Sequence, residues 1–330
     1  GLDSALTLAG AGDLTADDLS RFADLAGQPL AGRASATLAG QTALLTGAFD
    51  VTGQVRGNGL KIGVAEVDSL LSGASTIDLV VTRDESGTRL DRLDIAAASL
   101  TAKAKGTIAT AGSDITADLA FADLRALGPQ YRGSLNGLAR FQGTPEAGRV
   151  SLDAKGQSLA IGVAEADNLL KGDSTIQAEA TLAGSVVQLQ RLEVNAASLG
   201  VKASGKIDPA GHDLSADLAF RDLRALGGGY RGTLAAKAAF KGTPENGTLT
   251  ATATGSGLAI GQAEADRLLA GNSRLAANLR LQGGQIKIDS ATLENPQLRV
   301  AAKGDIAGNQ RQVTLDAALA NLGLLLPEFP

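Results

Sequence analysis

The 330-residue sequence contains no Cys, no Met and no Trp, and it has a single His, His212. Without Cys there is no disulfide framework and no thiol nucleophile, and one imidazole cannot build a zinc cluster. Nothing in the sequence supplies a catalytic triad or a glycine-rich phosphate loop. We therefore expect a protein that is not an enzyme and that carries neither a metal nor another cofactor.

Positive charge is not in excess, because 30 Lys and Arg stand against 35 Asp and Glu, for a net charge of −5. Such a chain offers no basic field to hold a nucleic-acid backbone, so nucleic acid is not an expected partner. Aromatic residues are also scarce, with seven Phe and two Tyr, whereas 42 residues are Gly and 44% are hydrophobic. The apolar side chains are mostly small, and they can build only thin apolar layers.

Long hydrophobic runs are missing, and none approaches the ~18 apolar residues of a transmembrane helix. The chain begins at Gly1 and shows no signal peptide. We expect a segment of a longer protein, and the absence of Cys fits an extracytoplasmic location.

What the sequence does contain is an internal repeat of 99 residues. LKIGVAEVDSLLSG at 60–73 returns as LAIGVAEADNLLKG at 159–172 and as LAIGQAEADRLLAG at 258–271. ADLAFADLRALGPQYRGSL at 117–135 returns 99 residues later, and the segment 23–36 aligns with 124–137 at an offset of 101. The chain thus consists of a partial copy (1–59), two full copies (60–158 and 159–257) and a further partial copy (258–330).

Within each copy apolar residues alternate with polar ones, which predicts β-strands with one apolar face. In the second full copy we expect about six strands, near 173–183, 185–195, 198–208, 212–222, 232–242 and 246–261. Pro and Gly mark hairpin turns at 208–211 and 243–247, and φ above zero is tolerated at Asn246-Gly247. Residues 164–170 predict a short helical turn that stops at Gly172, and 123–131 predicts another. The fold class is therefore all-β, a long antiparallel sheet of repeated units with very short helical turns at its edges.

An apolar sheet face must be covered, and the sequence has no long amphipathic helix to cover it. Either the sheet curls over itself or a ligand covers the face. Alkyl chains would suit such a surface, with ~0.8 kcal/mol gained for each buried CH₂. The residues expected to line this lipid groove are the apolar alternates Ile77, Leu79, Val81, Ile115, Leu119, Phe121, Leu135, Phe141, Ile176, Leu182, Leu214, Leu218, Phe220, Leu234, Phe240, Leu249, Leu275, Leu279, Leu315 and Leu319.

The opposing interpretation is a tandem array of β-sandwiches, as in surface stalks and adhesins, because 99 residues is close to the length of an immunoglobulin-like domain. The Trp and the paired Cys of true immunoglobulin domains are absent, and no linker separates the copies. Strand-like sequence runs across the boundary at 248–261. A continuous sheet is favoured over separate domains.

The segments ADLAGQPLAGRASATL (23–38), AEADNLLKGDSTIQAEATL (164–182), LEVNAASLGVKASGKID (192–208) and LDAALANLGLLLPEF (315–329) resemble the TamB family, the inner-membrane component of the translocation and assembly module, in its alphaproteobacterial form. More distantly, they are similar to AsmA-like bridge proteins. The resemblance implies a sheet curled into an open, taco-like trough with a hydrophobic interior, located in the periplasm. It further implies phospholipid transport between the two membranes, or assembly of outer-membrane barrel proteins with a TamA-like partner. An inner-membrane anchor and the partner-binding end would lie in parts of the protein absent from this sequence.

Four other motifs are weaker candidates. The carboxylate pairs Glu66/Asp68, Glu165/Asp167 and Glu264/Asp266 recur but lack the further ligands of a Ca²⁺ loop, so turn and helix-start acids are favoured. His212 falls in a hairpin turn, and Asn246 in a glycosylation sequon is better explained as a turn residue. Arg132 and Arg231, each after a Tyr, are candidates for a lipid phosphate, although a solvent-facing Arg is the simpler interpretation.

Three functional hypotheses follow. The first is a non-enzymatic lipid conduit whose apolar face holds acyl chains. The second is a scaffold or chaperone whose exposed strand edge templates a barrel strand by β-augmentation. The third is a surface stalk of separately folding units.

Overall fold

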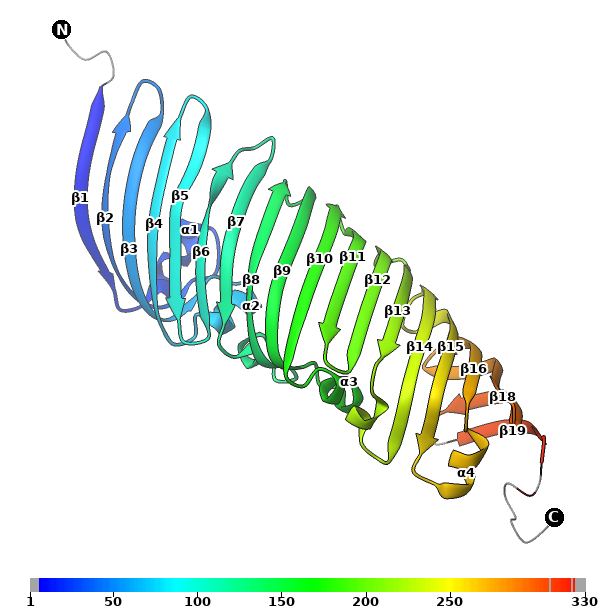
Figure 1. The fold of residues 1–330 in the computed structure, drawn as a ribbon. Helices are drawn as coiled ribbons and strands as arrows, with labels where there is room; N and C mark the ends of the chain where they lie inside the picture. The colour runs from blue at the N-terminus through cyan, green and yellow to red at the C-terminus, as the bar shows by residue number, and fades with distance from the viewer. Residues whose placement is uncertain (1–5, 309, 322, 324–330) are drawn as a thin grey trace. The chain divides into compact units, whose positions relative to one another are not determined.

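The computed structural model describes residues 6–308, 310–321 and 323. In this part of the chain there are nineteen β-strands, four short α-helices and three short 3-10 helices (Figure 1). The chain divides into two compact units, residues 1–162 and 163–330. The expected all-β, antiparallel fold with short helical turns is confirmed.

The first unit is an antiparallel meander in which each strand pairs with the next strand along the chain. Its elements are β1 (Thr7–Ala16), η1 (Leu19–Phe22), α1 (Ala23–Ala26), β2 (Ala31–Ala43), β3 (Ala48–Lys61), α2 (Ala65–Leu70), β4 (Ala74–Asp84), β5 (Gly87–Ala97), β6 (Leu100–Ile108), β7 (Ser113–Phe121), η2 (Leu124–Leu127), β8 (Arg132–Gly143) and β9 (Ala147–Ala160).

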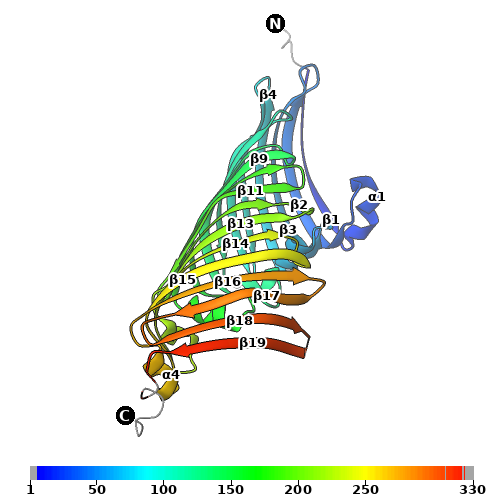
Figure 2. The same cartoon turned by 90° about the vertical axis from the view of Figure 1, so that its right-hand side faces the viewer.

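The second unit continues the same pattern of neighbour pairing, and Figure 2 shows its later strands, β13 to β19, following one another in a single layer. Its elements are α3 (Ala164–Leu169), β10 (Asp173–Ala183), β11 (Val186–Ala196), β12 (Leu199–Ile207), β13 (His212–Phe220), η3 (Leu223–Leu226), β14 (Tyr230–Gly242), β15 (Asn246–Ile260), α4 (Ala263–Leu268), β16 (Asn272–Gln282), β17 (Gln285–Glu294), β18 (Leu298–Ala307) and β19 (Gln310–Leu319).

The 99-residue repeat is present in the backbone as well as in the sequence. Helices α2, α3 and α4 begin at Ala65, Ala164 and Ala263, and the strand that follows each of them, β4, β10 or β16, has 11 residues. A β-bulge recurs between Val80 and Val81, between Glu179 and Ala180, and between Asn278 and Leu279. Six strands make up each full copy, as the sequence predicted, and the strand bounds of the second copy agree with the expected ones within two residues.

The boundaries between copies fall inside strands. Position 59/60 lies within β3, 158/159 within β9 and 257/258 within β15. Few contacts connect the two sides of a domain boundary, so the interior of a paired strand is a poor place for one. The continuity of the sheet across all copies stays a prediction.

The turn at 243–245 joins β14 to β15 as a hairpin, as the sequence predicted. The N–H of Thr243 donates to the carbonyl of Asn246 at 2.8 Å, and the N–H of Asn246 donates back to the carbonyl of Thr243 at 3.1 Å. Positive φ, which Asn246-Gly247 would tolerate, occurs at Gly242 instead, with φ 120. A Cβ on Gly242 would approach Gly247 Cα at 2.6 Å, so the crowding also requires glycine there.

Fully buried apolar side chains are few, and in both units they include the leucines of the short helices. In the first unit Leu70 and Leu71 of the α2 region are buried together with Leu60, near the end of β3, which α2 contacts. In the second unit the corresponding set is Leu169, Leu170 and Leu268, joined by Ala196 and Leu199. These helices are short, and the leucine that ends each of them, Leu70, Leu169 or Leu268, is buried.

Candidate functional site

The strand registers place the predicted groove-lining residues on one face of each unit's sheet, which we call the apolar face. In the second unit Leu214 pairs with Phe240, and Phe240 in turn pairs with Leu249. Leu249 pairs with Leu279, which continues the same row. In the first unit Ile115 pairs with Phe141 in the equivalent way. Residues that are far apart in the chain thus meet in rows that run across the strands.

Beside the row that contains Leu214, Phe240, Leu249 and Leu279, the apolar face of the second unit carries a row of alanines. It crosses seven strands, β12 to β18, and each member pairs with the next: Ala203, Ala216, Ala238, Ala251, Ala277, Ala291 and Ala302. A methyl group is shorter than the Leu and Phe side chains beside it. The row therefore forms a low apolar strip, perpendicular to the strands.

None of the twenty predicted residues is fully buried. Nineteen are half-buried, and Leu315 on β19 is 65% exposed. Within each unit, and among the described residues, strands make their main contacts with neighbouring strands, and no second sheet packs on the apolar face. The face therefore differs from a sandwich core, in which such side chains are buried.

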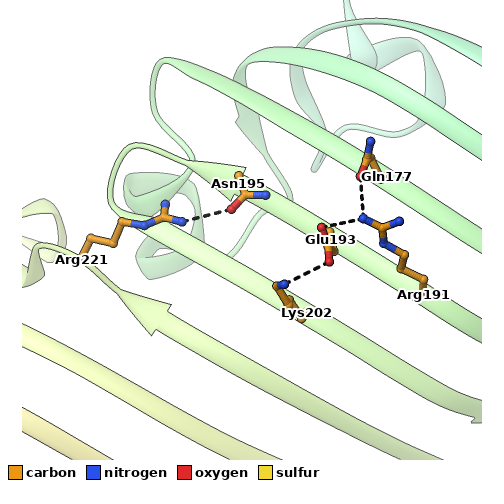
Figure 3. A network of polar contacts seen from close by, with 6 residues as sticks. All are labelled: Gln177, Arg191, Glu193, Asn195, Lys202 and Arg221. Carbon is orange, nitrogen blue, oxygen red and sulfur yellow. Dashed lines mark hydrogen bonds and ion pairs between the residues drawn. The ribbon is translucent and has the colours of Figure 1, made fainter.

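The opposite, polar face carries a network of cross-strand charges on β10, β11 and β12 (Figure 3). Glu193 accepts from Arg191 at 2.9 Å and pairs with Lys202 at 3.2 Å, while Arg191 also donates to Gln177. The hydrogen bond from Arg191, and then that from Lys202, hold the pKa of the Glu193 carboxyl below its ordinary value. In the first unit Arg140 binds Asp114 through two hydrogen bonds, and this contact lowers the pKa of Asp114.

Two of the recurring carboxylates, Asp68 and Asp266, have a local structural role, whereas Glu165 and Glu264 are exposed in the first turns of α3 and α4. Asp68 Oδ1 accepts the N–H of Ile62 at 2.7 Å, and Asp266 Oδ1 accepts the N–H of Ile260 at 2.7 Å. Each carboxylate thereby ties its short helix back to the end of the preceding strand. Asp167 has a partner too, and the side chain of Glu66 lies outside the described residues. No group of three or more His, Asp or Glu residues in the described part of the chain could hold a metal ion.

The remaining motif residues take ordinary structural places. His212 Nδ1 accepts the N–H of Asp208 at 3.3 Å, and its ring lies 6.5 Å from that of Phe240. Asn246 begins β15 directly after the 243–245 turn and pairs with Thr243 across it. Arg132 and Arg231 are exposed near the starts of β8 and β14, so a lipid phosphate there stays a prediction.

Sequence reasoning missed the polar-face contact between Arg221 and Asn195, which are 26 residues apart (Figure 3). Comparison of the copies carries a signal for it, because Ala96 and Ala122 stand 99 residues before these two positions. Both positions are therefore alanine in the first full copy and polar in the second.

Comparisons with known proteins gave no match to any family model, curated protein or solved structure. Among the described residues, no helix has the length and apolar character needed to cross a bilayer.

Proposed function

We propose that this chain is a non-enzymatic, periplasmic segment of a bridge-like protein of the TamB type, which moves phospholipids between the inner and outer membranes. Acyl chains lie along the apolar face, and the head groups stay at its open side. The observation that carries the proposal is the exposure of the apolar face, whose lining residues are half-buried at most. A soluble monomer rarely exposes more than a few hundred Å² of contiguous apolar surface, and larger patches mark binding surfaces.

The chemistry of the face suits an alkyl chain. Its Ala, Leu, Ile, Val and Phe side chains bring no charge and no hydrogen-bond donor, so they favour hydrocarbon without reading its structure. Sixteen CH₂ groups at ~0.8 kcal/mol each contribute roughly 13 kcal/mol before ordering costs. A bilayer offers a similar environment, so the surface favours passage between membranes over storage.

The alanine row of the second unit gives the acyl chain a direction. Because it runs across β12 to β18, a chain lying on the strip would travel from strand to strand. In the proposal the sheet curls around this strip as an open, taco-like trough. Segments outside this sequence would supply the inner-membrane anchor and the contact with a TamA-like outer-membrane partner.

Two adjacent alanines of β14 provide the test. Ala238 belongs to the alanine row, and Ala239 is exposed on the opposite face. The purified 330-residue chain should carry phospholipid on solvent extraction and mass spectrometry. Ala238→Asp should lose most of this lipid, because a buried carboxylate is incompatible with hydrocarbon. Ala239→Asp makes the same chemical change on the polar face and should retain it.

Circular dichroism of both variants separates loss of lipid from loss of folding. A folded Ala238→Asp variant that keeps its lipid would contradict the conduit, as would a wild-type chain that extracts no lipid from phospholipid vesicles.

A scaffold for barrel-protein assembly is the alternative, and strand β19 favours it. This strand pairs with β18 on one side, none of the described strands of its unit pairs with the other side, and nearly all its residues are exposed. An unpaired edge can accept an incoming strand by β-augmentation. Successive backbone N–H groups of a strand point to opposite sides, so at either residue 313 or residue 314 the N–H points away from β18. The corresponding variant, Val313→Pro or Thr314→Pro, should remove this edge-facing donor. That variant should lose binding to a barrel-strand peptide and keep lipid extraction.

A further inference from the structure

The polar face of the second unit contains two adjoining hollows of about 910 and 940 Å³. They share six lining residues: Ala219, Arg221, Ala235, Thr254, Arg274 and Glu294. Ala219, Ala235, Thr254 and Arg274 are successive cross-strand partners on β13 to β16. Small side chains thus form the floor, and Arg221 and Arg274 both line the two hollows.

The guanidinium of Arg221 is held in place by neutral acceptors. One of its nitrogens, Nη1, donates to the carbonyl of Ala196 at 2.6 Å and to that of Leu199 at 3.1 Å. The other, Nη2, donates to Asn195 Oδ1 at 3.1 Å (Figure 3). Gly200 leaves the space that this group occupies, since a Cβ there would lie 2.9 Å from Nη2. The group is held in this orientation, and no carboxylate in the described part of the chain pairs with it.

The other charges at the hollows are already paired. Lys202 pairs with Glu193, and Lys237 pairs with Asp217 at 2.8 Å. Glu294 is opposite Arg274 in the register, but its Oε1 accepts from Arg299 Nε at 2.8 Å. Among the described residues neither Arg221 nor Arg274 forms an ion pair. Two unneutralised guanidinium groups therefore face the same hollows.

The equivalent surface of the preceding copy lacks this arrangement. Ala122 and Thr175 stand 99 residues before Arg221 and Arg274, and Ala96 and Thr101 stand before Asn195 and Gly200. The hollow there is about 450 Å³, and its charged lining is balanced between two Lys and two Asp. Arg221, its Asn support and the Gly that makes room for it occur together in the copy 159–257, and Arg274 lies in the following copy. These residues therefore do not belong to the repeated scaffold.

We propose that Arg221 and Arg274 bind a phosphate group on the polar face of the second unit, independently of the lipid path on the apolar face. Three of the five N–H donors of Arg221 bind Ala196, Leu199 and Asn195, which leaves Nε–H and one hydrogen of Nη2 for phosphate oxygens. Arg274 adds a second positive charge, so that the two groups complement a divalent anion. The hollows have the volume of small-molecule sites, and their methyl-lined floor can take the organic part of a phosphate ester. The phosphate source is either a soluble phosphate ester or a phospholipid head group.

The test is a ³¹P NMR titration of the 330-residue chain with inorganic phosphate at low ionic strength, together with sedimentation with phosphatidylglycerol vesicles. Arg221→Gln with Arg274→Gln should weaken phosphate binding at least about tenfold, because both charge-assisted contacts are lost. The matched control is Arg224→Gln with Arg280→Gln. It removes the same charge from nearby arginines that are neutralised by Asp222 and Asp289, and it should leave binding unchanged.

A second variant carries the residues of the preceding copy: Asn195→Ala, Gly200→Thr and Arg221→Ala. The same residue types fold in the equivalent strands, and this variant should also lose phosphate binding. If vesicle binding falls in the variant that lacks both arginines, the phosphate source is a lipid head group. If the wild type binds inorganic phosphate but not the vesicles, the source is a soluble ester. Three results would overturn the proposal. The wild type binds neither inorganic phosphate nor vesicles, the variant that lacks both arginines binds as well as the wild type, or the control variant is weakened equally. Ala238→Asp, on the apolar face, should leave phosphate binding intact, so this test and that of the lipid conduit fail separately.

Discussion

Ser158 occupies in one copy of the repeat the left-handed backbone position that Gly257 occupies in the next, with φ values of 51 and 59. The residue after this position is a leucine, Leu159 or Leu258. In the later copy Leu258 turns back over Gly255 of its own strand, where a Cβ would lie 2.6 Å from Leu258 Cδ1. The left-handed residue is what allows the leucine to fold back. Ser158 is the sole non-glycine with positive φ in the described part of the chain.

Ser158→Gly should stabilise the protein by about 1 kcal/mol, because a Cβ in the left-handed region costs ~1–2 kcal/mol and glycine avoids that cost at the expense of chain entropy. Urea unfolding followed by circular dichroism measures the change. Ser151→Gly is the control, since it makes the same substitution in the extended part of β9 and should destabilise by ~0.5–1 kcal/mol. Equal destabilisation by both would show that position 158 carries no strain.

Two equivalent buried serines should respond differently to alanine. Ser75 is 5% exposed, and its hydroxyl has no hydrogen-bond partner among the described residues. Ser273 is 1% exposed, and its Oγ accepts from Asn295 Nδ2 at 3.4 Å. Ser75→Ala should leave stability unchanged or raise it, whereas Ser273→Ala should lower it by about 0.5–1 kcal/mol. Urea midpoints of the two variants in parallel provide the measurement, and the reverse order would refute the assignment.

Glu193→Gln should change how stability depends on pH. The folded-state pKa of Glu193 is lowered by Arg191 and then by Lys202, so its stabilising contribution is complete above the unfolded pKa, about 4.3. That contribution is lost as the pH falls through the folded-state value. Between pH 7 and about pH 3 the wild type should therefore lose more stability than Glu193→Gln. Glu245→Gln, in an exposed turn without an ion pair among the described residues, should behave like the wild type.

How much of this structure the sequence predicts depends on the range of the interaction concerned. In a strand, alternate residues point to opposite faces, so the alternation of Leu214, Ala216 and Leu218 assigns them to one face without knowledge of any other strand. The short helices and the hairpin positions follow from local residue preferences in the same way. The turn at 243–245 shows the limit, since Asn-Gly suggests a left-handed turn, but crowding between Gly242 and Gly247 across the hairpin places that conformation at Gly242.

The sequence by itself determined which residues form strands, which face is apolar and where the pattern repeats, because each of these depends on contacts between near neighbours in the chain. Only the tertiary structure aligned Ala216, Ala238 and Ala251 into one row, since their register depends on how each pair of strands is joined. It alone brought Arg221 to Asn195 and, with Arg274, to the same hollows, because these residues come from different strands and no local rule connects them.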